Sequence, residues 1–278
     1  MVSIGYRECM EMRQLEAECG PFISALPAPL ASETFVWSIA VKSAAPLSQL
    51  RLRSLSDPRI RGPVEFQTPQ ELLLWLGATH HLRSATLGHD ATLRVDEAKM
   101  LLDADESRHL ARFRHAEDRM SYLAAHAGAR LLLAAVTGQA ADRMRFETSP
   151  LGKPRLVDAP AGLDFSLSHA RGAVAVAAAY MPIGVDIEPL RQITDLDAMV
   201  EIALSPEERK TLARTPEALR SRHFLRYWTL KEAILKAAGV GFAVSPRTLI
   251  VDAGSSPAVL AVPDALGAAE QWRVIAAS

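Results

Sequence analysis

The sequence predicts an α+β fold, because its expected helices and strands are interleaved while the strands are short and follow one another in pairs. Residues 165–169 and 173–179 alternate or run apolar, as two paired strands do. Apolar residues at three- and four-residue steps between Ser107 and Thr137 predict an amphipathic helix that breaks near His115. This pattern favours α+β over a doubly wound parallel sheet.

The composition is that of a folded globular protein. Hydrophobic residues make up 49% and charged residues 23% of the 278 residues, far from the signature of disorder. A formal net charge of -1 gives no broad basic field for nucleic acid or an anionic membrane surface, so any anion site must be local. The longest uncharged run, 172–185, is too short to span a membrane. We expect a monomer that binds neither nucleic acid nor membrane.

The two cysteines, Cys9 and Cys19, exclude a disulfide scaffold and have no metal-ligand spacing. Residues 1–30 carry several charges and lack an apolar core flanked by basic residues, so we expect no secretory signal and a cytoplasmic location. Residues 1–67 show no sustained period and contain scattered prolines, which predicts a loosely ordered N-terminal extension. An apolar strand or short helix follows at 72–76.

Helix signals are strongest in the second part of the chain. Ser205 is a plausible N-cap, Pro206 the first helical position and Glu208 the capping-box partner. A long helix is expected over 216–238, ending at Gly239. The remaining expected elements are a helix at 195–202 and strands near 248–251, 258–262 and 272–276.

Two acidic residues, Asp186 and Glu188, lie two apart in an expected strand, so their carboxylates share one face. Such carboxylates repel one another unless a cation lies between them. Oxygen donors without thiolates suit Mg²⁺, which usually takes one or two carboxylates together with substrate phosphates. The alternative is the exposed end of a strand with two solvated acids.

The long helix carries Trp228, Glu232 and Lys236 at four-residue steps, with Lys231 adjacent, so one acid and two ammonium groups lie on neighbouring turns. The alternative is an ordinary Glu–Lys helix pair beside a tryptophan in the core.

Histidine and arginine side chains could bind anions in the first part of the chain. His169 follows Ser168 at the end of an expected strand, where hydroxyl, imidazole and backbone groups could hold a phosphate. It could also simply cap the strand. The helix before it has an arginine face, which is equally compatible with a solvated surface: Arg108, Arg112, Arg114 and Arg119.

Four motifs occur together in one order: Gly152-Lys-Pro154, Phe165-Ser-Leu-Ser-His169, Gly184-Val-Asp-Ile-Glu188, and Trp228-Thr-Leu-Lys-Glu-Ala233 with Lys236 and Gly239-Val-Gly241. This series resembles the 4'-phosphopantetheinyl transferases of the larger, surfactin-synthetase-activating type. The resemblance covers roughly residues 70–275 and includes Arg112-Phe-Arg-His115 and Asp118-Arg119 with Tyr122.

The resemblance implies two similar α+β halves, 68–183 and 184–278, packed as a pseudo-dimer with coenzyme A in the cleft between them. It assigns Mg²⁺, bridging the coenzyme A diphosphate, to three acids: Asp186, Glu188 and Glu232. It assigns contacts with the phosphates and adenosine to five residues: Arg112, Arg119, Lys153, Ser168 and His169. Relatives usually continue through one more strand after the position of Trp272, so we expect the second half to expose a sheet edge.

The implied reaction transfers 4'-phosphopantetheine from coenzyme A to a serine of an apo acyl or peptidyl carrier protein and releases adenosine 3',5'-bisphosphate. Glu232, directly or through a water, would deprotonate the serine, while Mg²⁺ with Lys231 or Lys236 would stabilise the leaving group. The acidic carrier is expected to dock on a basic and apolar patch of the long helix: Arg220, Arg222, Phe224 and Arg226.

Two other functions compete with this one. A non-catalytic relative would bind carrier protein or coenzyme A without transfer, but the three retained acids speak against it. A different Mg²⁺-dependent phosphoryl-transfer enzyme would share the acids and lysines, but not the Ser-x-Ser-His and Trp-x-x-Lys-Glu-Ala motifs.

Overall fold

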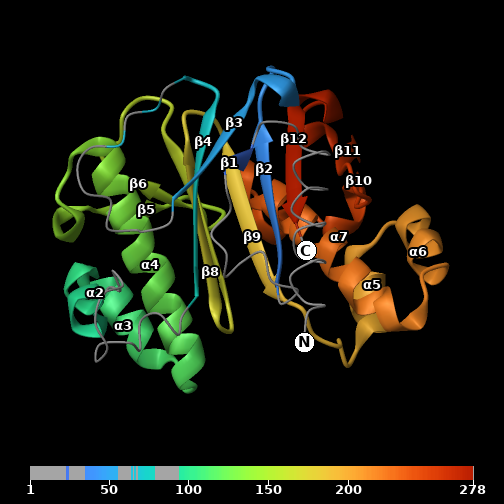
Figure 1. Ribbon diagram of the computed structural model, residues 1–278, viewed down its shortest axis with the longest axis horizontal. Coiled ribbons are helices and arrows are strands. Elements are labelled where there is room, and N and C mark those ends of the chain that lie inside the picture. Colours follow the sequence, from blue (N-terminus) through green and yellow to red (C-terminus); the bar gives the residue numbers. More distant parts are fainter. Residues whose placement is uncertain are drawn as a thin grey trace, which may run out of the picture.

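The computed structural model describes residues 23–24, 35–55, 64, 66, 68–78 and 94–277. Two β-sheets lie face to face in the middle of the molecule, and a long helix covers the outer face of each sheet (Figure 1). Helices and antiparallel strand pairs are both present, which confirms the α+β class. Within the described ranges no helix is long and apolar enough to cross a bilayer.

The first sheet has the strand order β1-β3-β4-β8-β7. Its antiparallel β7–β8 pair turns at Arg171 and Gly172, where Gly172 has a φ of 87° that favours glycine. This hairpin confirms the paired strands predicted from the sequence. The strands are β1 (Ile23–Ser24), β3 (Arg51–Leu55), β4 (Glu71–Ala78), β7 (Asp164–Ala170) and β8 (Ala173–Ala179).

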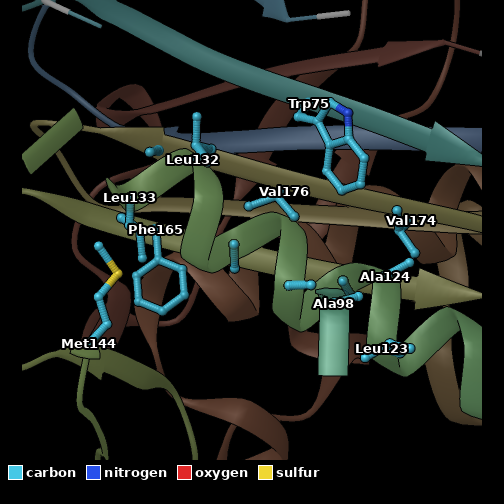
Figure 2. Close-up of a cluster of buried hydrophobic side chains, with 14 of the residues drawn as sticks. Trp75, Ala98, Leu123, Ala124, Leu132, Leu133, Met144, Phe165, Val174 and Val176 are labelled. Carbon is cyan, nitrogen blue, oxygen red and sulfur yellow. The ribbon is translucent and has the colours of Figure 1, made fainter. Parts of the chain in front are cut away.

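Helix α4 (Ala116–Thr137) covers the outer face of this sheet, and the predicted break near His115 is confirmed because His115 is its N-cap. In Figure 2, leucines of α4 pack with Phe165 and Val176. Helix and sheet touch closely at Gly128, where a Cβ atom would lie 2.2 Å from the Trp75 ring. The neighbouring elements are α2 (Val95–Leu101), α3 (Ala104–Arg112), β5 (Phe146–Thr148) and β6 (Pro154–Leu156).

The second sheet has the order β12-β2-β9, and it corrects the expectation of a loose N-terminal extension for residues 35–42. Residues 1–22, 25–34, 56–63, 65 and 67 of that expected extension lie outside the described residues. Its central strand is β2 (Phe35–Lys42), which pairs antiparallel with β9 (Ile183–Pro189) and with β12 (Trp272–Ala277). Residues 36–41 are at most 1% exposed, so this segment is core and not a loose extension. Strand β9 therefore has β2 as its partner in this sheet, and β12 is the strand at the other edge.

The second sheet is covered by α7 (Glu217–Ala238). The predicted capping box of α6 (Pro206–Ala213) is confirmed, because Ser205 and Glu208 each accept from the backbone N–H of the other. Gly239 ends α7 with a φ of 67°, as predicted. The other elements of this region are α5 (Leu196–Ala203), β10 (Ile250–Asp252) and β11 (Ala258–Ala261). Short 3-10 turns are η2 (Leu47–Gln49), η4 (Ala141–Arg143), η5 (Gly241–Ala243), η6 (Pro246–Thr248), η7 (Asp264–Leu266) and η8 (Ala269–Gln271).

Helices α4 and α7 share several features. Each has 22 residues, follows two short helices, and ends at a left-handed glycine, Gly138 or Gly239. Arg130 and Lys231 occupy the same position along the two helices, and each is fully buried. Arg130 forms an ion pair with Glu106 of the α3 capping box, as Lys231 does with Glu208 of the α6 capping box.

Candidate active site

The candidate site lies where edge strand β7 of the first sheet runs beside edge strand β9 of the second. Two serines of β7 hold the strands together. Ser166 Oγ accepts a hydrogen bond from the backbone N–H of Val185 at 3.1 Å, and Ser168 Oγ donates to Asp186 Oδ1 at 2.8 Å. The alternation of β7 therefore directs both hydroxyls of the Ser-x-Ser motif toward β9.

Helix α7 lies directly on β9 at Gly184. A Cβ atom at this position would come within 2.0 Å of the carbonyl oxygen of Ala233, so only glycine permits this approach. The close contact brings the last turns of α7 to Asp186. Lys236 Nζ donates to Asp186 Oδ1 at 2.6 Å and to Ser168 Oγ at 3.0 Å.

Three carboxylates of the site influence one another. Burial and, to a smaller extent, the charge of Asp186 raise the pKa of Glu188 to about 7. Burial also raises the pKa of Glu232, again with a contribution from Asp186. Glu232 of α7 thus lies close enough to the Asp186 carboxylate on β9 to be influenced by its charge.

Two carboxylate oxygens of the site, Asp186 Oδ2 and Glu232 Oε1, are buried and accept no hydrogen bond. An acceptor that is buried without a hydrogen bond lowers the stability of the fold by about 1–3 kcal/mol. Oxygen donors of this kind fit a hard cation such as Mg²⁺. In the described part of the chain, no three His, Cys, Asp or Glu side chains already surround one metal position. Lys236 instead neutralises Asp186.

A pocket of about 260 Å³ opens beside these groups, between β7, the start of β6 and the C-terminal part of α7. Glu232, Lys236 and Lys153 line it together with residues of β7. Lys153 Nζ pairs with Asp164 and donates to the carbonyl oxygens of Ile183 at 3.0 Å and Ala237 at 3.3 Å. Burial lowers the pKa of Lys153, and Asp164 raises it. Lys153 therefore links β7 to β9 and α7 at the rim of the site.

His169 lies near the end of β7, 5.9 Å from the Tyr122 ring between ring centroids. Burial and, to a smaller extent, the charges of His126 and Lys236 lower the pKa of His169 to about 4. The imidazole is therefore neutral at physiological pH, and it can donate a hydrogen bond from one nitrogen only.

Lys231 does not join the site, although it is adjacent to Glu232 in the sequence. Its side chain is fully buried, its Nζ pairs with Glu208, and it donates to the carbonyl oxygens of Ala203 at 2.8 Å and Pro246 at 3.1 Å. The expected catalytic role of Lys231 is therefore corrected to a structural one. Consecutive helical residues point about 100° apart, so Glu232 faces β9 while Lys231 faces α6.

Replacing Lys231 with methionine is expected to destabilise the fold by about 3–5 kcal/mol, because Glu208 would remain buried without its cation. Urea unfolding followed by circular dichroism measures the loss. The protein that remains folded should keep kcat within about threefold of wild type, whereas Lys236→Met removes the cation beside Asp186 at the site and should lower kcat. A loss of kcat without a loss of stability in Lys231→Met would restore the catalytic role.

The two arginines assigned to coenzyme A, Arg112 and Arg119, lie on the surface where α3 ends and α4 begins. Arg119 donates to the carbonyl oxygen of Phe113 at 2.8 Å. Asp118, the neighbour of Arg119, lies close enough to His169 to influence its pKa, which places this corner beside the end of β7. Neither arginine forms an ion pair with the three acids. Their assignment to coenzyme A stays a prediction.

The expected docking patch on α7 is not formed as predicted. Phe224 is 1% exposed and belongs to the core under the second sheet. Arg226 donates to the carbonyl oxygens of Ala253 and Gly254, and Arg220 to those of Thr215 and Ala213. These side chains hold α7 to its neighbouring loops.

Sequence reasoning missed one residue that holds the site. Asp164 pairs with Lys153 and accepts a hydrogen bond from the backbone N–H of Ile183 at 2.9 Å, next to β9. Nothing in the residue pattern of its strand indicated this role for Asp164. Trp228, interpreted as a core residue, packs against the core under the second sheet, as predicted.

The raised pKa of Glu188 predicts a pH dependence of stability in metal-free buffer. Its folded-state pKa of about 7 exceeds the ordinary 4.5, so the folded chain holds this proton more tightly than the unfolded chain. The resulting stabilisation is complete below about pH 4.5 and is lost as the pH rises through 7. The pKa of His169 is lowered in the fold, so its contribution to the pH dependence of stability has the opposite sign. Comparing two proteins that both retain His169 cancels this contribution.

Glu188→Gln is therefore expected to gain stability over wild type between pH 5 and pH 8 when a chelator is present. The gain is at most about 3 kcal/mol and is reduced by solvent that reaches this half-buried side chain. Urea unfolding at each pH gives the difference. Parallel pH profiles for the two proteins would contradict the assignment.

Comparison with known proteins adds an independent observation. The sequence model of the 4'-phosphopantetheinyl transferase superfamily matches residues 182–275. The 4'-phosphopantetheinyl transferase HetI of Nostoc sp. is 34% identical over 170 residues, which cover 60% of this chain and 72% of HetI. The 4'-phosphopantetheinyl transferase psf-1 of Bacillus pumilus is 28% identical over 154 residues, covering 55% and 65%. The 4'-phosphopantetheinyl transferase Sfp of Bacillus subtilis is 32% identical over 104 residues, covering 36% and 44%.

Proposed function

Because the chain belongs to the 4'-phosphopantetheinyl transferase superfamily, we propose that it transfers the 4'-phosphopantetheine group of coenzyme A to a serine of an apo acyl or peptidyl carrier protein. The observation that carries the proposal is the meeting of Asp186 and Glu188 of β9 with Glu232 and Lys236 of α7 beside one pocket. The family match covers both β9 and α7, so the segments that carry these residues are also the ones that match the family.

In the proposed reaction the serine oxygen forms a bond to the phosphorus that carries pantetheine. The bond from this phosphorus to the bridging oxygen breaks, and adenosine 3',5'-bisphosphate leaves with that oxygen. The serine proton passes to Glu232, directly or through a water. A raised pKa suits Glu232 to this role, because a stronger base accepts a proton more readily near neutral pH.

Positive charge and hydrogen bonds would hold the diphosphate. Lys236 Nζ is already fixed at the site by Asp186 and Ser168, so it offers an ammonium group in a defined position. Lys153, Ser168 and His169 are proposed to contact the phosphates and adenosine of coenzyme A. Arg112 and Arg119 would contribute from the corner between α3 and α4.

Asp186, Glu188 and Glu232 are proposed to hold Mg²⁺ through oxygen atoms. The two unpartnered buried oxygens, Asp186 Oδ2 and Glu232 Oε1, support this assignment. When bound, the cation would supply charge that neutralises the diphosphate. A complete protein cage is not required, since Mg²⁺ usually keeps waters and substrate phosphates among its ligands.

We also propose that the two parts of the chain form an intramolecular pseudo-dimer. The equivalent positions of Arg130 and Lys231, each paired with a capping-box glutamate, support this relation. The proposed boundary near Gly184 separates the two sets of helices, but β2 must be counted with the second half because it lies between β9 and β12. In this relation the β2 strand corresponds to β8.

Product analysis tests the proposed function. Apo carrier proteins are incubated with the full chain, coenzyme A and Mg²⁺, and each intact carrier is weighed by mass spectrometry. The expected result is a mass gain of one phosphopantetheine group, together with release of adenosine 3',5'-bisphosphate. Binding of carrier or coenzyme A without any mass gain across a broad carrier panel would favour the non-catalytic alternative.

A further inference from the structure

A second, larger pocket of about 520 Å³ lies between the halves of the molecule. Strand β6 and the start of β7 form one side, and the end of α7, the end of β2 and Trp272 form the other. It shares Lys153, Phe165 and Gly239 with the candidate active site, but neither Glu232 nor Lys236 lines it. It is therefore a neighbouring pocket with its own lining.

Uncompensated positive charge marks this pocket. Its charged lining consists of Lys42, Lys153 and Arg155 with one acid, Asp164, which pairs with Lys153. Across the described ranges, no carboxylate lies within ion-pair distance of Lys42 or Arg155. Two cations from opposite sides of the pocket are thus left for a ligand. The C-terminal end of α7 is less repulsive to an anion because Lys153 binds the Ala237 carbonyl.

Most of the remaining lining is apolar, and it includes two nearly buried aromatic residues, Trp272 and Phe165. Trp272 is 3% exposed, and its indole N–H donates to the carbonyl oxygen of Leu266 at 3.3 Å, which holds the ring in place. Lys42 Nζ lies 5.8 Å from the centroid of this ring. Phe165, also 3% exposed, belongs to the facing wall. An apolar wall beside two free cations is the usual composition of a small-molecule site at a domain interface.

We propose that this pocket binds a small anion that carries a planar apolar group. The anionic group would lie at Lys42 and Arg155, and the planar group would lie toward Trp272. The volume is within the range of about 300–1,000 Å³ that is typical of small-molecule sites. The site neighbours the proposed coenzyme A site and shares Lys153 with it, but its anion contacts are assigned to Lys42 and Arg155, so the proposal does not depend on transferase activity.

The test uses 1-anilinonaphthalene-8-sulfonate, an anion with planar rings, as the probe. The full chain is labelled with 5-fluorotryptophan, and the Trp272 resonance is identified from Trp272→Phe. Titration followed by fluorine NMR should shift the Trp272 resonance and leave that of Trp228, beside Glu188, unchanged. Saturating coenzyme A should not reverse the shift.

Charge removal tests the role of the two cations. Lys42→Gln and Arg155→Gln should each weaken probe binding about fivefold, as expected for the loss of one partly exposed charge contact. Arg145→Gln is the matched control, because this arginine is exposed and outside the pocket lining, and it should leave binding unchanged. An unshifted Trp272 resonance, displacement by coenzyme A, or unchanged affinity in both pocket variants would overturn the proposal.

Discussion

Glu232→Gln is expected to lower kcat for phosphopantetheine transfer by about 100-fold to 10,000-fold while the chain stays folded. Glutamine keeps the size of the side chain but cannot accept the serine proton. It also removes one negative charge from the cluster with Asp186, so the free energy of unfolding should not fall. Initial rates of carrier modification at saturating coenzyme A and Mg²⁺ give kcat.

The matched control is Glu217→Gln, which makes the same change in the exposed first turn of the same helix. This variant should transfer at the wild-type rate. If Glu232→Gln retained more than about a tenth of wild-type kcat, Glu232 could not be the proton acceptor, and the mechanism would have to use another base.

Removal of residues 1–43 is expected to abolish cooperative folding, because it deletes β2 from the centre of the second sheet. Strand β9, which carries Asp186 and Glu188, would lose its whole ladder with β2, and the core between the sheets would lose Trp37, Ile39 and Val41. Each large buried side chain typically contributes about 2–5 kcal/mol, and the total stability of such a domain is only about 5–15 kcal/mol. Circular dichroism and urea unfolding measure the outcome.

A point substitution separates the strand itself from the rest of the deleted segment. Ile39→Asp places a charge in the core, whereas Leu47→Asp makes a similar change at a residue that is 39% exposed. The first should unfold the protein or lower its stability by more than about 4 kcal/mol, and the second should have little effect. A deletion variant that unfolds cooperatively and transfers phosphopantetheine would show that β2 is dispensable.

Local signals in the sequence were sufficient for helices α4, α5, α6 and α7 and for the hairpin β7–β8, whereas α2 was not predicted. Ser205 and Glu208 predict the start of α6, and Gly239 predicts the end of α7, because a helix cap depends on residues within one turn. The pair Asp186 and Glu188 could be placed on one face from strand alternation alone. Their meeting with Glu232 depended on the family motifs, since no local rule relates β9 to α7.

The features that were predicted wrongly, strand β2 and the role of Lys231, depend on contacts between segments that are distant in the sequence. Strand β2 has partners more than a hundred residues away, at β9 and β12, so nothing nearby in the sequence shows that residues 35–42 are paired. Lys231 and Lys236 look equivalent as helical lysines. Only the surroundings of α7 distinguish them, with Glu208 of α6 on one side and Asp186 on the other.

Three carboxylates are proposed to hold a cation at the coenzyme A diphosphate, and isothermal titration of coenzyme A with and without Mg²⁺ tests this proposal directly. For wild type, Mg²⁺ should tighten binding at least tenfold. For the double variant Asp186→Asn, Glu232→Gln, metal-free binding should be as tight as in wild type or tighter, because two repelling charges are gone. In that variant Mg²⁺ should add little beyond its effect on free coenzyme A. An equal Mg²⁺ effect in both proteins would contradict the proposal.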